Sequence, residues 1–120
     1  MMKETKTLID AIVQGIQEKK GSDITIVDLG NIEGAICKDF VICQGQSPSQ
    51  VDAIADSVEE FARTKAGDKP SKVIGRENSI WVAMDFGDVI VHIFVPDARS
   101  FYDLEHLWED APTTLIPNLD

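Results

Sequence analysis

The stretch SIWVAMDFGDVIVHIFVPDARSFYDLEHLW, residues 79–108, decides the fold of this chain. It predicts strands over 80–84 and 89–95, joined by a tight turn around Gly87, and then a helix over 98–108. Side chains alternate between the two faces of a strand, so this hairpin has two unlike faces. One face is wholly aliphatic, as is typical of a protein core, and carries Ile80, Val82, Met84, Val89, Val91, Ile93 and Val95.

The opposite face of the hairpin mixes residue types and carries Trp81, Ala83, Asp85, Ile90, His92 and Phe94. A face of this composition packs against a helix or contacts another molecule. Tryptophan is among the residue types most enriched where proteins bind each other. Spacing alone leaves two interpretations of Trp81 open, a core position under a helix and a contact with a partner. The mixed face nevertheless favours recognition over chemistry.

The first third of the chain predicts one helix and two strands. An amphipathic apolar stripe predicts a helix over 5–20, which Gly21 ends. β-Branched residues predict a strand over 24–29. A continuous apolar run over 39–43 predicts a central strand that is covered on both faces.

Helix-start signals follow in the middle of the chain. Ser47 suits the N-cap, Pro48 the first helical position and Gln50 the third position of a capping box. This helix ends at Gly67, and residues 72–74 predict a short strand. The last helix has Asp97 as its expected N-cap. Its apolar spacing predicts a buried stripe of Phe101, Leu104 and Trp108.

The element order is therefore αββαβββα, which predicts a single α/β domain with helices packed on a mixed sheet. The chain has 120 residues, close to the commonest domain size. We assign this domain to residues 1–110. The acidic tail over 111–120 contains two prolines, and we expect it to be poorly ordered.

The charge balance limits the class of partner. The formal net charge is -10, so the protein's field attracts cations and basic surfaces and repels phosphates. Direct nucleic-acid contact is therefore disfavoured, and a basic protein partner is favoured. Solubility is an equally good explanation of the same charge. We expect a cytoplasmic protein, because Cys37 and Cys43 lack a disulfide or metal pattern and no stretch is apolar enough to span a membrane.

No pattern of residues identifies a catalytic, cofactor or metal site. The segment over 45–47 lies between a strand and a helix but lacks a phosphate-loop spacing. Asp28, Asp39, Asp85 and Asp88 could hold a metal, yet no strand carries the Asp-x-Asp pattern of polymerase-type sites. The two histidines, His92 and His106, accompany no marked nucleophile.

Several segments together resemble one known family, the ribosomal silencing factors, also called Iojap-related proteins. The matching motifs are DFVICQG at 39–45, DFGDVIVH at 85–92 and FYDLE at 101–105, followed by Leu107 and Trp108. The resemblance covers about residues 5–110. The sequence departs from the shared pattern at Phe40 and in its acidic tail.

This resemblance implies a nucleotidyltransferase-like fold without the catalytic motifs of that superfamily. It implies a factor that binds large-subunit ribosomal protein fourteen, blocks the joining of the two ribosomal subunits and represses translation during starvation or stationary phase. It also implies a homodimer in isolation. We expect no cofactor and no catalytic residue, and we assign partner binding to Trp81, Asp85, Asp88, His92 and Tyr102.

Two alternatives remain open. One is a degenerate nucleotidyltransferase-like enzyme, which must bind nucleotide, so a titration with magnesium and nucleotide would distinguish it. The other is an assembly factor for the large subunit, which the sequence cannot separate from a silencing factor.

Overall fold

A computed structural model describes residues 2–119 of the chain. Its elements are α1 (Met2–Glu18), β1 (Ser22–Asp28), β2 (Asp39–Gln44), α2 (Pro48–Ala66), β3 (Lys72–Ile74), β4 (Trp81–Asp85), β5 (Val89–Phe94), α3 (Pro96–Tyr102), α4 (Leu104–Leu107) and β6 (Thr113–Ile116). Within the described residues the strands form one sheet in the order β3-β4-β5-β2-β1-β6. β2 and β5 run parallel and the other neighbours antiparallel, which confirms the mixed sheet.

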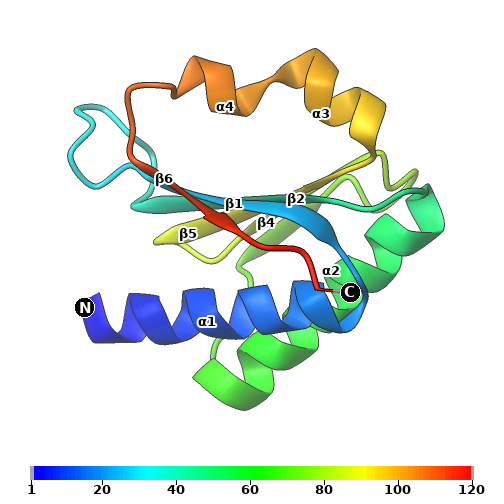
Figure 1. Ribbon diagram of the computed structural model, residues 1–120. Helices are drawn as coiled ribbons and strands as arrows, with labels where there is room; N and C mark the ends of the chain where they lie inside the picture. The colour runs from blue at the N-terminus through cyan, green and yellow to red at the C-terminus, as the bar shows by residue number, and fades with distance from the viewer. Residues whose placement is uncertain (1, 120) are drawn as a thin grey trace.

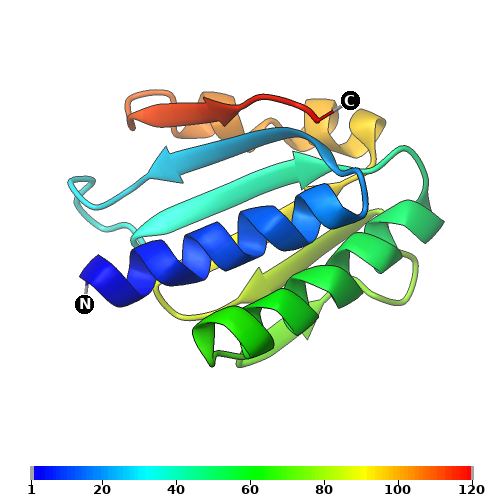
Figure 2. The same cartoon turned by 60° about the horizontal axis from the view of Figure 1, so that its bottom comes forward.

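The sheet is the middle of three layers. Helices α1 and α2 cover one face, and α3 and α4 lie over the other (Figure 1). Figure 2 shows α1 and α2 side by side along the first face. They approach closely at Gly15, whose carbonyl oxygen accepts a hydrogen bond of 2.7 Å from the Ser57 hydroxyl. A Cβ at Gly15 would meet the α2 backbone, so the small residue is what permits this close approach.

The aliphatic face of the hairpin lies in the core beneath α1 and α2. Its fully buried members are Val82, Met84, Val89, Val91 and Ile93. They pack with the apolar stripes of the two helices, which confirms the predicted direction of this face. Removal of this apolar surface from water is the main driving force for docking the helices on the sheet.

The predicted start and end of α2 are confirmed. Ser47 is the N-cap and accepts a hydrogen bond from the Gln50 backbone N–H, and Gly67 ends the helix in the left-handed conformation. The Gln50 side chain differs from a simple capping box. Its amide donates to the carbonyl oxygens of Lys19 and Lys20 at 3.0 and 3.2 Å, so it also satisfies the end of α1.

The hairpin turn lies at residues 87–88. The Phe86 N–H donates to the Val89 carbonyl oxygen at 2.8 Å, and Gly87 has a φ of 91°, which a glycine adopts without strain. The register places Trp81 opposite Phe94, and the next pair on the same face joins Ala83 and His92. This register confirms that the residues of the predicted mixed face lie on the same side of the hairpin.

The helix predicted over 98–108 is instead two short helices. Asp103 has a φ of 52° and separates α3 from α4. The N-cap of α3 is Val95, not Asp97, which lies in the first turn. The break also changes the predicted stripe, because Phe101 is 81% exposed while Leu104 and Trp108 still pack toward the sheet.

The tail is another difference from the sequence prediction. Thr113–Ile116, expected to be poorly ordered, form β6 and pair antiparallel with β1. The segment is β-branched and aliphatic, and β1 offers it an open edge. Pro112 and Pro117 lie just outside the strand, where a missing N–H does not interrupt the ladder.

Candidate partner-binding surface

A cluster of aromatic rings fills the space between the mixed face of the sheet and α3. Trp81 stacks on Phe94 with ring centroids 4.9 Å apart and contacts Tyr102 of α3 at 4.5 Å. Phe40 of β2 lies edge-on to the His92 ring at 4.6 Å and 6.2 Å from Trp108. Trp81 is half-buried in this cluster, so it is partly a packing residue, and its contact with a partner stays a prediction.

His92 lies beneath Trp81 and not at the surface. It is 7% exposed, and its Nδ1 accepts a hydrogen bond of 3.1 Å from the Trp81 indole N–H. Burial lowers the pKa of His92 to about 4, so the imidazole is neutral near pH 7. In this position the His92 ring is too buried for direct contact with another molecule.

Apolar side chains are exposed on the outer side of α3 and α4. Phe101, Tyr102 and Leu107 are 81%, 49% and 69% exposed, and the rings of Phe101 and Tyr102 touch edge to face at 5.1 Å. Together with half-buried Trp81 and Trp108 we call these residues the α3–α4 surface. Grouped exposed apolar residues of this kind mark sites of interaction with other molecules.

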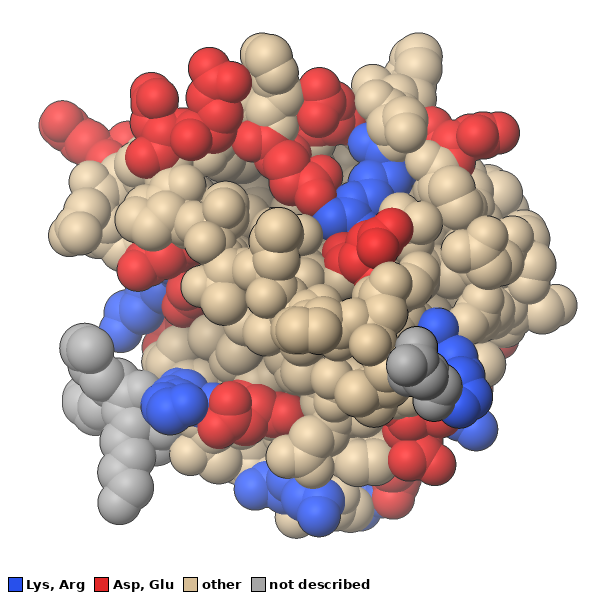
Figure 3. Space-filling model, in the orientation of Figure 1, with Lys and Arg blue, Asp and Glu red and all other residues tan. Residues whose placement is uncertain are grey.

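Acidic side chains lie beside the apolar residues of α3 and α4. Figure 3 shows Asp and Glu side chains gathered along the top of the molecule, over α3 and α4. The acidic residues of this segment are Asp97, Asp103, Glu105, Glu109 and Asp110. The apolar surface is therefore bordered by negative charge, which attracts a basic partner.

Asp85 and Asp88 lie at the far end of the hairpin. The Asp85 carboxylate accepts a hydrogen bond of 2.8 Å from the Gly87 N–H, and Asp88 lies 3.8 Å from the ammonium group of Lys38. Asp85 lies four positions along β4 from Trp81, a distance of about 13 Å. The structure therefore does not bring these carboxylates into the aromatic cluster with Tyr102, and their contact with a partner stays a prediction.

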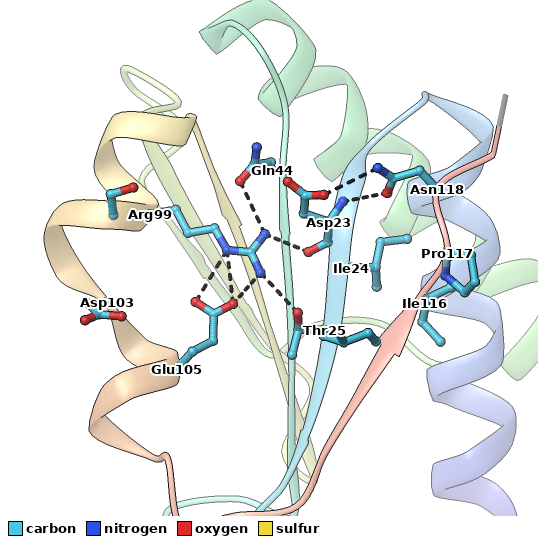
Figure 4. A pocket seen from close by; sticks show the side chains of 12 residues that line it. Asp23, Ile24, Thr25, Gln44, Arg99, Asp103, Glu105, Ile116, Pro117 and Asn118 are labelled. Carbon is cyan, nitrogen blue, oxygen red and sulfur yellow. Dashed lines mark hydrogen bonds and ion pairs between the residues drawn. The ribbon is translucent and has the colours of Figure 1, made fainter.

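Arg99 holds α3 and α4 against the sheet. Its guanidinium donates to the Asp23 carbonyl oxygen at 2.7 Å and to the Thr25 hydroxyl at 3.1 Å, and it forms an ion pair with Glu105 (Figure 4). These groups line an open groove of about 630 Å³ between α3 and β6. The arginine is satisfied by Glu105, so the groove offers no free positive charge to an anion.

No pattern in the sequence indicates this arginine–glutamate pair. Residues six apart point to different sides of a continuous helix. Arg99 and Glu105 meet because the chain turns at Asp103. Only a prediction of that turn would have found the pair.

Carboxylates also gather where β1 ends and β2 begins. Asp28 and Asp39 face each other across the β1–β2 ladder. Burial, together with the charges of Asp28 and Asp88, raises the pKa of Asp39 to about 6. Among the described residues, no group of three or more His, Cys, Asp or Glu side chains is arranged to hold a metal ion. No helix within residues 2–119 is long and apolar enough to cross a membrane.

Comparison with known proteins decides the family. Residues 2–120 match the family described as "Ribosomal silencing factor during starvation". The chain belongs to the ribosomal silencing factor family. Ribosomal silencing factors from Halalkalibacterium halodurans and Bacillus subtilis are 38% and 37% identical to it, over 88% and 89% of this chain and 89% of each relative.

More distant relatives extend this family to organelles. The chloroplastic protein Iojap of Zea mays is 36% identical over 65% of this chain and 33% of its own length. A mouse protein named for mitochondrial assembly of the ribosomal large subunit is 28% identical, over 83% of this chain and 44% of its own length. The name of the mouse protein connects that relative with the large ribosomal subunit.

Solved structures confirm the fold of this silencing factor. A crystal structure from Bacillus halodurans matches with a TM-score of 0.78 and 33% identity, covering 92% of this chain and 99% of that one. Another, from Chromobacterium violaceum, matches with a TM-score of 0.75 and 32% identity over 91% and 86%. The resemblance seen in the sequence motifs is therefore confirmed, and the family match includes the β6 segment.

Proposed function

We propose that this silencing factor binds the large ribosomal subunit through large-subunit ribosomal protein fourteen and blocks joining of the small subunit. Occupation of the joining face represses translation during starvation or stationary phase. The observation that carries the proposal is an exposed apolar surface on a member of this family. Phe101, Tyr102 and Leu107 are exposed to solvent on α3 and α4, and Trp81 beside them is half-buried.

The charge around this surface supports a ribosomal partner of basic character. Acidic residues border the apolar side chains of α3 and α4, and the whole chain carries a formal net charge of -10. A negatively charged rim favours approach to a basic protein and disfavours direct contact with RNA phosphates. Asp85, Asp88 and Tyr102 belong to this proposed interface, and His92 supports it from below.

A test uses purified ribosomal subunits. The tagged protein should retain large and not small subunits in a pull-down, and it should lower the yield of joined ribosomes in a sedimentation assay. Phe101→Ala should weaken both effects. Phe61→Ala provides a matched control, because Phe61 is a half-buried phenylalanine on α2, in the opposite layer. Equal loss in both variants would argue against the α3–α4 surface.

A role in large-subunit assembly is the second candidate function. The mouse relative named for assembly of the mitochondrial large subunit favours it. An assembly factor would bind immature particles, and its absence would slow or prevent maturation of the large subunit. Binding to mature subunits that blocks their joining supports the first function, whereas binding restricted to immature particles supports the second.

A further inference from the structure

The Trp81 side chain has one polar group, and a neighbour inside the protein already binds it. The indole N–H donates to His92 Nδ1 at 3.1 Å. Trp81 and His92 lie on adjacent antiparallel strands, and the ladder that pairs Ala83 with His92 fixes their relative position. Phe94 and Tyr102 contact the indole at centroid distances of 4.9 and 4.5 Å.

The hydrogen bond also fixes which nitrogen of His92 carries the proton. His92 is buried and neutral, and a neutral imidazole has one N–H. Because Nδ1 accepts from Trp81, the proton lies on Nε2. Nε2 is buried and has no hydrogen-bond partner among the described residues. The histidine therefore leaves one of its own groups unsatisfied while it satisfies the indole.

We propose that His92 is a positioning residue for Trp81, holding the indole in one orientation and taking up its N–H. Trp81 then meets its partner as a ring without a hydrogen-bond donor. The partner site at this point is therefore an apolar pocket, and not an acceptor such as a carboxylate. This inference rests on the proposed function, because it describes how the same surface is recognised.

A purely space-filling role for His92 makes different predictions. Any side chain of similar volume would then serve, whether or not it accepts a hydrogen bond. His92→Leu fills space without an acceptor. His92→Asn loses volume but keeps an oxygen near the position of Nδ1. The comparison of these two variants separates positioning from packing.

The wild-type protein gives the first test, which needs no variant to fold. Long-range nitrogen–proton NMR spectra of the histidines should show His92 with an unprotonated Nδ1 and a protonated Nε2. The opposite tautomer would overturn the proposal, since a protonated Nδ1 cannot accept from Trp81.

Indole proton exchange gives the second test in the free protein. With tryptophan labelled by nitrogen-15, His92→Leu should speed exchange of the Trp81 indole proton by about tenfold, reflecting loss of one hydrogen bond. His92→Asn should restore slow exchange, and the Trp108 indole serves as the internal reference. Unchanged exchange of the Trp81 indole in folded His92→Leu would overturn the proposal.

Binding to large ribosomal subunits gives the third test as a double-mutant cycle. His92→Leu should weaken binding about tenfold in the wild-type background and less than about twofold when Trp81 is replaced by phenylalanine. Equal losses in both backgrounds would show that His92 does not act through the indole N–H. Failure of the wild-type protein to bind large subunits would reject the proposed function, while the two NMR tests would still decide the role of His92.

Discussion

At the residue scale, Trp81 connects the packed interior with the surface. It stacks on Phe94, contacts Tyr102 and remains half-buried. Trp81→Ala should weaken binding to the large subunit by about 2 kcal/mol or more, the scale of an interface hot spot. The variant should also lose part of its free energy of unfolding, because ring contacts are removed, yet it should stay folded.

Isothermal titration and thermal unfolding of the same Trp81→Ala sample separate these two effects. Phe61→Ala on α2 should lower stability without changing affinity. A Trp81→Ala protein that is unfolded, or one that binds as tightly as the wild type, would contradict the assignment of Trp81 to the interface.

Asp39 gives a second prediction at this scale. Asp39 lies directly opposite Asp28 in the β1–β2 ladder, and burial with nearby negative charge raises its pKa to about 6. Above that pH the folded protein must hold a charged carboxylate in an unfavourable position. Asp39→Asn should therefore raise the free energy of unfolding near pH 8 by about 1 kcal/mol, a value reduced for solvent screening.

The sign of this effect follows from proton linkage. A carboxyl group with a raised folded pKa gives stability that is present below its unfolded pKa, near 3.8, and lost as the pH rises through about 6. The gain from Asp39→Asn should therefore disappear at pH 3.5. Denaturant titrations at the two pH values measure it, with Asp110→Asn as a control at an exposed carboxylate. An equal gain at both values would rule out this charge effect.

At the scale of elements, local chemistry explains which parts of the fold were predictable. Ser47 and Gly67 mark the ends of α2 by their own capping preferences, and the alternation of residues 80–95 reports two faces directly. These signals act within a few residues of chain. The mixed sheet and the aliphatic core face follow from them.

The parts that were not predictable depend on distant contacts. The pattern over 98–108 is helical throughout, yet the chain turns at Asp103, and Arg99 binds β1 and Glu105 across the turn. Thr113–Ile116 become a strand because β1 has an open edge, which the tail itself does not reveal. For the candidate site, the sequence analysis selected Trp81 and Tyr102, whose contact with a partner stays a prediction, and it placed Phe101 in the core instead of on the surface.

Removal of β6 tests the importance of that edge. A chain that ends at Pro112 lacks the partners of Ile24–Val27 and the hydrogen bond of 2.8 Å from the Asp23 N–H to the Asn118 side chain. Its free energy of unfolding should fall by about 2 kcal/mol, since hydrogen bonds and the packing of Ile116 are lost.

Hydrogen exchange localises this effect. Amides of β1 that face β6 should exchange faster in the shortened chain, while those that face β2 should change little at first. A chain that ends at Asn118 keeps β6 and serves as the control. If the shortened chain matched this control in both stability and exchange, β6 would be an unimportant appendage.

At the scale of the whole molecule, the negative charge should guide association. The formal net charge is -10, and acidic residues gather over α3 and α4. Raising the salt concentration from about 0.05 M to about 0.5 M shortens the screening length severalfold and should slow association with purified large-subunit ribosomal protein fourteen by about tenfold. Dissociation should change much less, and surface plasmon resonance measures both rates. An association rate that is independent of salt would argue against electrostatic guidance.

The proposed mechanism is occupancy, and occupancy has a fixed stoichiometry. In the proposed mechanism, the surface formed by Phe101, Tyr102 and Leu107 covers the partner, and one molecule occupies one large subunit. Inhibition of subunit joining should therefore increase with the ratio of protein to large subunits and level off near one to one. Small subunits that are already joined should protect against inhibition, because the small subunit and the protein compete for one face.

A catalyst would instead inactivate an excess of subunits at trace amounts, and washing it away would not restore them. Titration of purified subunits, followed by removal of the protein and a second joining assay, distinguishes these cases. Lasting inhibition at a substoichiometric dose would reject the steric mechanism, whereas full recovery after washing is what reversible occupation of the joining face requires.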